Sequence, residues 1–340
     1  MASSGRSPAA DADGEGKLAE QDSEALSIGV VGTGSFGRNH VRVLSDLDGV
    51  VLAGVYDLDA TTRRAVAEEY GTRAFDRLDE LAEACDAAVL AVPTAAHAAV
   101  GCELFAAGLD LLIEKPFAVT LEEADRLLEA GDGRTVAVGH VEFYNPAVQA
   151  LLELGIEPGF VEVQRRSGFS PRSLDIDVVL DLMIHDLQIL HALDPSPVRE
   201  VRATGISVLS DRVDIANVRL EFESGCVANL TASRVSAERE RKLRAFFRRR
   251  YYSLDYEQQE IKGYRLEAAG GERRIVPDDL PVRRGEPLRR ELEAFAARCR
   301  GERIPLVDGE QGRRALQTAL WITDIIAETG PVEAGGGGDV

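Results

Sequence analysis

Two polar residues inside an apolar segment are the first candidates for chemistry in this chain. Asp181 and His185 lie four positions apart, so a helix would place both side chains on one face. Burying a carboxylate beside an imidazole is unfavourable unless the two groups pair, and pairing makes the ring more basic. The spacing therefore predicts a general base, His185, oriented by Asp181, with a purely structural hydrogen bond as the alternative. We expect the adjacent Asp186 to point elsewhere, as a surface or capping acid.

The second candidate is the tripeptide Glu114-Lys115-Pro116, which directly follows an apolar, strand-like run. Lys115 is one of only four lysines in the chain, and an ammonium group is a mobile donor whose pKa is easily tuned. Pro116 restricts Lys115 to extended backbone geometry and allows a cis bond. The alternative is an ordinary solvated loop lysine.

A glycine pattern near the N-terminus predicts a dinucleotide site. Gly32, Gly34 and Gly37, with Ser35 and Phe36 between them, follow an apolar run and open a segment that is expected to be helical through about Leu44. In a strand–turn–helix unit such glycines allow a tight turn, close approach of a pyrophosphate and close helix–strand packing. A plain glycine-rich turn is the alternative, and it leaves the acid described next unexplained.

Asp57 lies twenty residues beyond Gly37, at the end of a second apolar run. A carboxylate there accepts hydrogen bonds from a ribose 2′-hydroxyl and repels a 2′-phosphate, so we expect NAD rather than NADP. Arg63 and Arg64, one helical turn further on, are the residues that could favour NADP instead.

Alternating apolar runs and helical patterns predict an α/β domain over residues 25–143. The runs lie near 27–31, 51–56, 87–92, 110–113 and 135–138. This rhythm is typical of βαβ units that form a doubly wound, parallel Rossmann sheet with helices on both faces. Ligands bind such sheets at the carboxyl ends of the strands.

Residues 144–330 are expected to form a C-terminal α+β domain with a large, open, mainly antiparallel sheet. Period-2 alternation runs from 198 to 274, and helical patterns lie near 145–154, 180–193, 288–300 and 310–328. Helices cover one face of such a sheet, and a second subunit is the simplest cover for the other. We therefore expect a homodimer or homotetramer formed through the open sheet.

Bulk composition excludes several classes of function. A net charge of −19 argues against nucleic acid or an anionic membrane as partner, and no apolar run is long enough to span a bilayer. Residues 1–24 and 331–340 have the composition of flexible tails without the core of a signal peptide, so we expect a cytoplasmic protein. The four cysteines are scattered without ligand spacing, and no metal site is expected.

The scarcity of lysine among many acidic residues has two open explanations. A cytoplasm rich in salt would screen the repulsion between carboxylates. A GC-rich genome that replaces lysine with arginine would give the same pattern.

Taken together, these motifs resemble the glucose-fructose oxidoreductase / inositol dehydrogenase (Gfo/Idh/MocA) family from about Ser27 to Glu328. The matching pieces are Gly32-x-Gly34-x-x-Gly37-x-x-His40, Asp57, Val92-Pro93-Thr94-x-x-His97, Glu114-Lys115-Pro116, Gly139-His140 with Asn145-Pro146, and Asp181-x-x-x-His185-Asp186. The resemblance implies an enzyme that oxidises a sugar or cyclitol hydroxyl reversibly with NAD(P).

The same resemblance implies roles for individual residues. His185 would take the hydroxyl proton, Lys115 would hydrogen-bond the developing alkoxide, and Asp181 would orient the histidine. Thr94, His97 and Glu114 would line the nicotinamide side. Gln188 stands where the family often has an aspartate, and Phe143 where it often has an arginine.

A narrower resemblance points to members that act on nucleotide-linked amino sugars such as UDP-N-acetylglucosamine. It rests on the region around His140 and Asn145 and on the segment ending in Arg234, which we expect to bind substrate. The arginine-rich run 239–250 could meet a diphosphate, with a solvated strand face as the alternative. Two rival functions remain: an NAD-dependent glycosidase on the same fold, and a non-catalytic NAD-dependent sensor.

Overall fold

The computed structural model describes residue 1 and residues 25–169, 176–269 and 272–329. The two expected tails fall almost entirely outside these residues. None of the helices within the described ranges is long and apolar enough to cross a membrane.

The first sheet is parallel and has five strands in the order β2-β1-β3-β4-β5. The strands are β1 (Leu26–Val31), β2 (Val50–Tyr56), β3 (Ala87–Leu90), β4 (Asp110–Glu114) and β5 (Val136–Gly139). Continuous aliphatic runs form these strands because helices bury both faces. The expected Rossmann sheet is confirmed, and the chain reverses direction across the sheet between β1 and β3, where such sheets bind ligands.

Short helices follow each strand of this sheet. They are α1 (Ser35–Leu44), α2 (Ala60–Tyr70), α3 (Leu78–Ala82), η1 (Thr94–Ala96), α4 (His97–Ala106), α5 (Leu121–Ala130) and η2 (Val141–Tyr144). Side-chain caps start two of them: Asp59 accepts from the Thr61 amide for α2, and Thr120 accepts from the Glu123 amide for α5.

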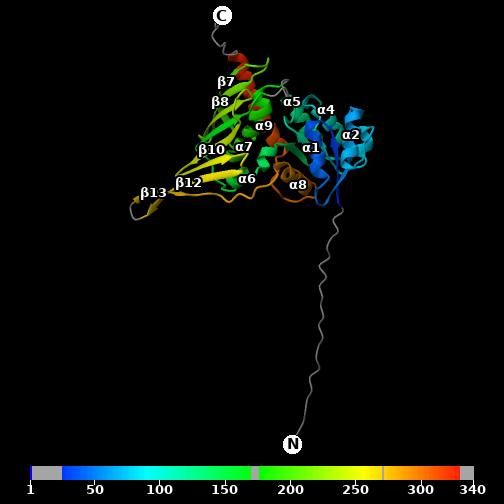
Figure 1. Cartoon of the computed structure of the whole chain (residues 1–340), viewed down its shortest axis with the longest axis horizontal. Helices are drawn as coiled ribbons and strands as arrows, with labels where there is room; N and C mark the ends of the chain where they lie inside the picture. The colour runs from blue at the N-terminus through cyan, green and yellow to red at the C-terminus, as the bar shows by residue number, and fades with distance from the viewer. Residues whose placement is uncertain (2–24, 170–175, 270–271, 330–340) are drawn as a thin grey trace, which may run out of the picture.

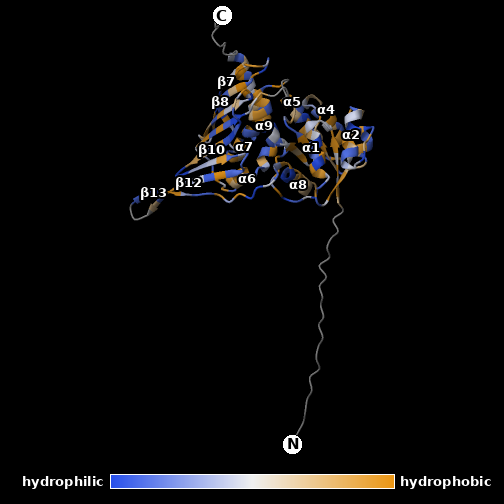
Figure 2. Ribbon diagram, in the orientation of Figure 1, coloured by the Kyte–Doolittle hydropathy of each residue, from blue (hydrophilic) through white to orange (hydrophobic). Residues whose placement is uncertain are grey.

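The second sheet has eight strands in the order β13-β12-β11-β10-β6-β9-β8-β7. They are β6 (Phe160–Arg166), β7 (Val198–Ile206), β8 (Ile215–Phe222), β9 (Val227–Ser233), β10 (Glu240–Phe247), β11 (Arg250–Asp255), β12 (Glu260–Ala269) and β13 (Glu272–Pro277). The pairing is antiparallel as expected, except that β6 and β9 run parallel. Hydrophilic and hydrophobic residues intermingle along its strands because alternate side chains face core and solvent (Figure 2).

Helices cover one side of this sheet, between it and the first domain (Figure 1). They are α6 (Pro146–Leu152), the π-helical turn η3 (Val179–Met183), α7 (Ile184–Leu193) and α9 (Gly309–Thr329), with α8 (Pro287–Cys299) against the first domain. Leu292 and Phe295 of α8 belong to the first hydrophobic core. The boundary at residue 143 stays a prediction, since helices from the end of the chain contribute to both cores.

The other side of the large sheet carries a row of aromatic side chains. Phe160, Phe246, Tyr251 and Tyr264 are cross-strand neighbours on β6, β10, β11 and β12. Successive ring centroids lie 5.6, 5.0 and 6.3 Å apart. Tyr264 is 45% exposed. By contrast, Tyr252, which directly follows Tyr251 in β11, is buried on the helix-covered side.

Candidate active site

Two glycines where β1 leads into α1 have no space for a side chain. Gly32 has a φ of +91°, and a Cβ on it would lie 2.5 Å from the carbonyl oxygen of Ala91. A Cβ on Gly37 would lie 1.8 Å from the carbonyl oxygen of Gly32. At Gly34 the situation is reversed, because a Cβ would meet nothing within 4 Å. Open space beside an uncapped helix N-terminus is what a pyrophosphate requires.

Asp57 lies beside this turn at the end of β2. One carboxylate oxygen accepts from the amide of Thr33 at 2.6 Å and from its hydroxyl at 2.9 Å. Arg63 is 5% exposed, donates to the backbone carbonyl of Asp57 and pairs with Asp76. These residues fit a dinucleotide: the glycine turn and α1 would hold its pyrophosphate and Asp57 its ribose hydroxyls.

Gly34 and Gly37 allow a matched test of the proposed dinucleotide site. Gly34→Ala is expected to leave the melting temperature unchanged and to weaken NAD binding, because its methyl group enters the open space. Gly37→Ala is expected to lower stability by several kcal/mol, since overlap with the backbone cannot relax cheaply. Thermal melting and fluorescence titration with NAD measure both. Equal loss of stability in the two variants would contradict the assignment.

Lys115 connects the carboxyl edge of the parallel sheet to the second domain. Its ammonium group donates to the backbone carbonyl of Asp181 at 2.7 Å and to the carboxylate of Asp181 at 3.2 Å. The side chain of Lys115 is 8% exposed, and its bond to Pro116 is cis, as the sequence allowed. Two segments that lie 66 positions apart in the chain thus meet here.

Two histidine rings lie next to this contact. The rings of His140, which follows β5, and His185 in α7 are edge-to-face with centroids 5.8 Å apart. Neither nitrogen of His140, nor Nδ1 of His185, has a hydrogen-bond partner among the described residues. Burial, then the charge of Lys115, lowers the pKa of His140 to about 3 and holds that of His185 well below 6.5. Both rings are therefore neutral near pH 7, and each can donate one hydrogen bond to a ligand and accept one from it.

The expected pair between Asp181 and His185 was wrong. The carboxylate of Asp181 binds Lys115 instead. Asp181 lies in the π-helical turn η3, and His185 lies in the α-helix that follows. Lys115 offers the carboxylate a charged donor, whereas the ring of His185 is neutral, and charge-assisted hydrogen bonds are the stronger ones.

The residues expected around the nicotinamide are held by contacts within the protein. Glu114 accepts from Nε2 of His40 at 2.7 Å; burial raises its pKa, but that bond and Lys115 outweigh the burial and leave the pKa lowered. The ring of His97 contacts the carbonyl oxygens of Val92 at 3.0 Å and Pro116 at 3.1 Å. His97 therefore positions the Lys115 loop, and Thr94 starts the short helix η1 before it.

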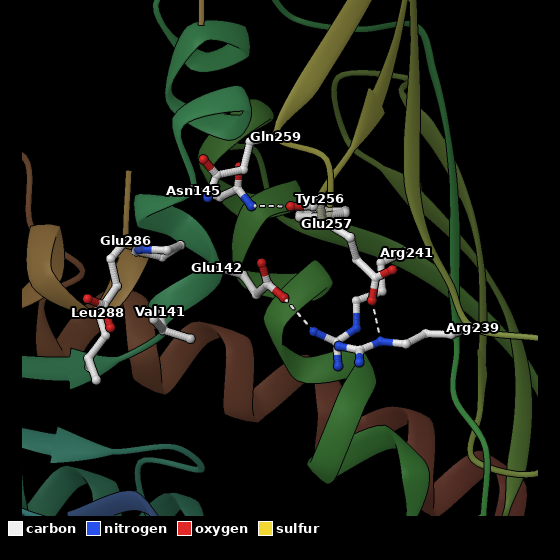
Figure 3. Close-up of a pocket in the computed structure, with 11 residues that line it drawn as sticks. Val141, Glu142, Asn145, Arg239, Arg241, Tyr256, Glu257, Gln259, Glu286 and Leu288 are labelled. Atoms are coloured by element: carbon white, nitrogen blue, oxygen red, sulfur yellow. Dashed lines mark hydrogen bonds and ion pairs between the residues drawn. The ribbon is translucent and has the colours of Figure 1, made fainter. Parts of the chain in front are cut away.

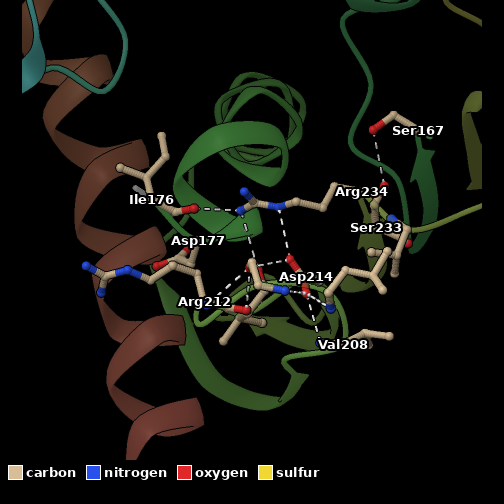
Figure 4. Close-up of polar contacts among 12 residues, drawn as sticks. Ser167, Ile176, Asp177, Val208, Arg212, Asp214, Ser233 and Arg234 are labelled. Atoms are coloured by element: carbon tan, nitrogen blue, oxygen red, sulfur yellow. Dashed lines mark hydrogen bonds and ion pairs between the residues drawn. The ribbon is translucent and has the colours of Figure 1, made fainter. Parts of the chain in front are cut away.

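Asn145 and Arg234, both expected to bind substrate, have structural contacts. Asn145 caps α6 and donates to the carbonyl of Tyr256 at 2.9 Å. Arg234 extends toward Asp214 and donates to the carbonyl of Ile176 at 2.6 Å, just before η3 (Figure 4). A direct contact of either residue with substrate stays a prediction.

A buried ionic network was missed by the sequence analysis. Asp186, expected to be a surface or capping acid, is 1% exposed and binds Arg165 through both oxygens at 2.6 and 2.8 Å. Arg165 also donates to Glu142 at 3.0 Å, and the hydroxyl of Tyr256 donates to Asp186 at 3.1 Å. An available signal was the inward alternation of β6, in which a charged residue at 165 follows valines at 161 and 163.

Glu291 of α8 is a second polar residue that the sequence analysis missed. It is fully buried, and neither carboxylate oxygen has a hydrogen-bond partner in the part of the chain that the structure describes. Burial, then the charge of Glu114, raises its pKa well above 4.5. Its position in the apolar stripe with Leu288, Leu292 and Phe295 was the available signal.

Removing this carboxyl group is expected to stabilise the protein at neutral pH. A raised pKa means that the folded state holds a proton the unfolded state releases above about pH 4.5, so stability falls as pH rises from there. Glu291→Met should therefore raise the free energy of unfolding by about 1–3 kcal/mol at pH 7. The gain should shrink toward pH 4. Urea titrations at both pH values test this, with the exposed Glu293→Met as control; a gain that is independent of pH would contradict it.

A cavity of about 530 Å³ opens beside η2, the segment that follows His140. Glu142, two residues after His140, lines it together with Arg239 and Arg241 at the start of β10 and Glu257 in the β11–β12 turn (Figure 3). Its volume is in the usual range for small-molecule sites.

Comparison with known proteins agrees with this geometry. Residues 26–140 match the oxidoreductase family with an NAD-binding Rossmann fold, and residues 123–252 match the GFO/IDH/MocA C-terminal domain. The chain is 37% identical over 302 residues to a UDP-N-acetylglucosamine 3-dehydrogenase of Acidithiobacillus ferrooxidans, covering 87% of this chain and 96% of that one. The chain belongs to the GFO/IDH/MocA family. An inositol 2-dehydrogenase of Leifsonia xyli is 31% identical over 188 residues, or 52% of this chain and 56% of that one.

Solved structures of other proteins have the same fold. The structure of the Acidithiobacillus ferrooxidans enzyme GnnA superposes with a TM-score of 0.83 at 37% identity and covers 89% of this chain and 98% of that one. GenD2 from gentamicin A biosynthesis, in complex with NAD, has a TM-score of 0.76 at 21% identity, covering 90% and 95%. The chain is therefore an NAD(P)-binding oxidoreductase of this family.

Proposed function

We propose that this protein oxidises a hydroxyl group of a UDP-N-acetylglucosamine-like sugar nucleotide with NAD, using His185 as general base. The observation that carries the proposal is the contact of Lys115 with Asp181 beside the neutral ring of His185, at the carboxyl edge of a dinucleotide-binding sheet. The choice of sugar nucleotide is supported by the name and 37% identity of the Acidithiobacillus relative.

Each residue of this group has a defined task in the reaction. His185 accepts the proton of the substrate hydroxyl as the carbonyl forms. Lys115 donates to the developing alkoxide and is held in place by its bonds to Asp181. His140 adds a second neutral ring that can orient the hydroxyl. Bound NAD supplies the acceptor for the hydride that leaves the same carbon.

NAD is proposed over NADP because of the surroundings of Asp57. Its carboxylate lies beside the glycine turn, where it would repel a 2′-phosphate. Arg63, the nearest cation along the chain, is engaged by Asp76 and by the carbonyl of Asp57. Arg64 is exposed and is therefore the residue that could still favour NADP. The Kd values of NAD and NADP test the preference.

The deciding experiment is NADH absorbance with the purified protein, NAD and a panel of UDP-sugars, free hexoses and inositols. Turnover of UDP-N-acetylglucosamine that is lost in His185→Ala supports both the reaction and the base. Turnover of free sugars or inositols alone keeps the dehydrogenase chemistry and overturns the sugar-nucleotide substrate. Release of a free sugar without net NADH indicates the glycosidase, and tight NAD binding without any turnover indicates the sensor.

The open face of the large sheet is proposed to bind a second copy of this chain. The aromatic row from Phe160 to Tyr264 gives it an apolar strip, and Asn217 and Arg219 bond across strands to Thr231 and Asn229 beside that strip. We expect a mass of two or four times 36.8 kDa by light scattering. The double variant Tyr251→Arg with Tyr264→Arg should be monomeric. The control Val51→Arg, at an exposed position of β2, should keep the oligomeric state of the wild type. A monomeric wild type would contradict the proposal.

A further inference from the structure

The cavity beside η2 has a cation that the protein itself leaves poorly neutralised. Arg241 on β10 lies directly opposite Arg165 on β6, and both side chains face the helix-covered side of the sheet. Like charges in this arrangement repel, so carboxylates must lie between them. Glu142 is the carboxylate that the two arginines share.

The sharing is unequal. Glu142 lies 3.0 Å from Arg165 and 3.4 Å from Arg241, and the second distance is longer than an ordinary hydrogen bond. Arg165 also has both oxygens of Asp186, whereas Nε of Arg241 has no hydrogen-bond partner among the described residues. Burial, then the charge of Arg165, lowers the pKa of Arg241. The side chain of Arg241 remains 27% exposed at the cavity.

The other charges of the cavity are already paired. Glu257 binds Arg239, and Glu286 binds Arg42. Figure 3 shows Arg239 and Arg241 converging on the same space from β10, with Glu142 and Glu257 beside them. An anion that enters here would meet both Arg239, whose side chain is 59% exposed, and Arg241, whose side chain is 27% exposed.

We infer that Arg241, assisted by Arg239, binds the diphosphate group of a nucleoside diphosphate sugar and so positions the sugar at His185. The inference rests on the proposed function and extends it by naming the residues that recognise the nucleotide. Arginine suits this task because its planar donors match phosphate oxygens and its charge does not titrate. Arg241 pairs with Glu142, which lies two residues after His140 and also binds Arg165. Arg165 in turn binds Asp186, the residue after His185. This chain of ion pairs links the anion site to the two segments that carry the histidine pair.

The test compares ligands with and without phosphate. Calorimetry on the full chain with NAD present measures the Kd of UDP, uridine and inorganic pyrophosphate. Arg241→Gln is expected to weaken UDP binding by about 10- to 100-fold and to leave uridine binding unchanged. Arg241→Lys should lose less, and Arg239→Gln should show a smaller effect in the same direction. Arg244→Gln, which lies on the outer face of the same strand, is the control and should bind like the wild type.

Several outcomes would overturn the inference. A wild type that binds UDP no better than uridine would do so, and so would an Arg241→Gln variant that loses both ligands equally. Melting curves show whether Arg241→Gln is folded, and the charge-preserving Arg241→Lys gives an independent reading if it is not. If UDP binding depends on Arg241 while only inositols are oxidised, the substrate proposal fails and the anion site stands. If UDP-N-acetylglucosamine is oxidised equally well without Arg241, the substrate proposal stands and the anion site fails.

Discussion

His185→Ala is expected to lower kcat for substrate oxidation by about 100- to 10,000-fold, the usual contribution of a general base. NAD affinity should change little, because the glycine turn and Asp57, not His185, would hold the cofactor. Steady-state NADH formation and a fluorescence titration with NAD measure the two effects separately. A variant that loses turnover and NAD binding together would contradict the assignment.

The control for this variant is on the same helix. His191 lies in α7 too, but its Nε2 contacts the hydroxyl of Thr318 at 2.8 Å, away from Lys115. That hydroxyl donates to the carbonyl of Arg314 at 3.2 Å, so His191 must donate through Nε2. His191→Asn is expected to reduce stability while keeping most of the turnover per folded molecule. Equal loss of kcat in both variants would indicate a helix-packing defect rather than a missing base.

The pH profile gives an independent test of His185. Burial and the positive charges of Lys115 and Arg165 lower its pKa well below 6.5, so the ring stays neutral and able to accept a proton into mildly acidic solution. The acidic limb of kcat/KM for oxidation should therefore lie below pH 6.5. An acidic limb at or above pH 6.5 that persists in every histidine variant would show that another group acts as the base.

Arg165→Leu is expected to destabilise the fold by about 3–5 kcal/mol, because it leaves the buried Asp186 without its counter-ion and Glu142 with only the more distant Arg241. Asp186 is 1% exposed and the side chain of Arg165 is 3% exposed, so solvent cannot replace the lost bonds. Urea denaturation measures the loss. The neighbouring Arg166→Leu, on the outer face of β6 and 44% exposed, should change stability by about 0.5 kcal/mol or less.

A double variant separates pairing from packing. Arg165→Leu with Asp186→Leu removes both main partners, so its loss should be smaller than the sum of the two single losses. A strictly additive result would mean that Arg165 and Asp186 stabilise the fold independently. Because the charge of Arg165 also acts on His185, the acidic limb of kcat/KM should shift to higher pH in the single variant if it remains folded.

Much of the fold followed from local pattern. The five apolar runs before residue 140 became the five parallel strands, and alternation after residue 198 became the strands of the large sheet. These predictions succeeded because strand and helix periodicity depend on residues that are near in sequence. The parallel pairing of β6 with β9 was not accessible in this way, since the two strands are joined through η3, α7, β7 and β8.

The candidate site was predicted in its residue types but not in its contacts. Lys115, Asp181 and His185 do come near one another, yet Asp181 binds the lysine and not the histidine. The π-helical turn that contains Asp181 has no clear signal in a segment of leucine, valine and methionine. Asp186 was placed on the surface because charged residues are rarely buried, and the exception required a buried arginine on a distant strand.

The glycine turn, the acid at the end of β2 and the order of helices and strands could all be predicted from the amino-acid sequence. Each of these depends on backbone conformation or periodicity within a few neighbouring residues, and the chain carries that information locally. Which charges pair became visible only in the folded chain: Lys115 with Asp181, Arg165 with Asp186, and Arg241 with the Glu142 that it shares with Arg165. Ion pairing and burial depend on distances between segments that are far apart in sequence, and folding alone sets those distances.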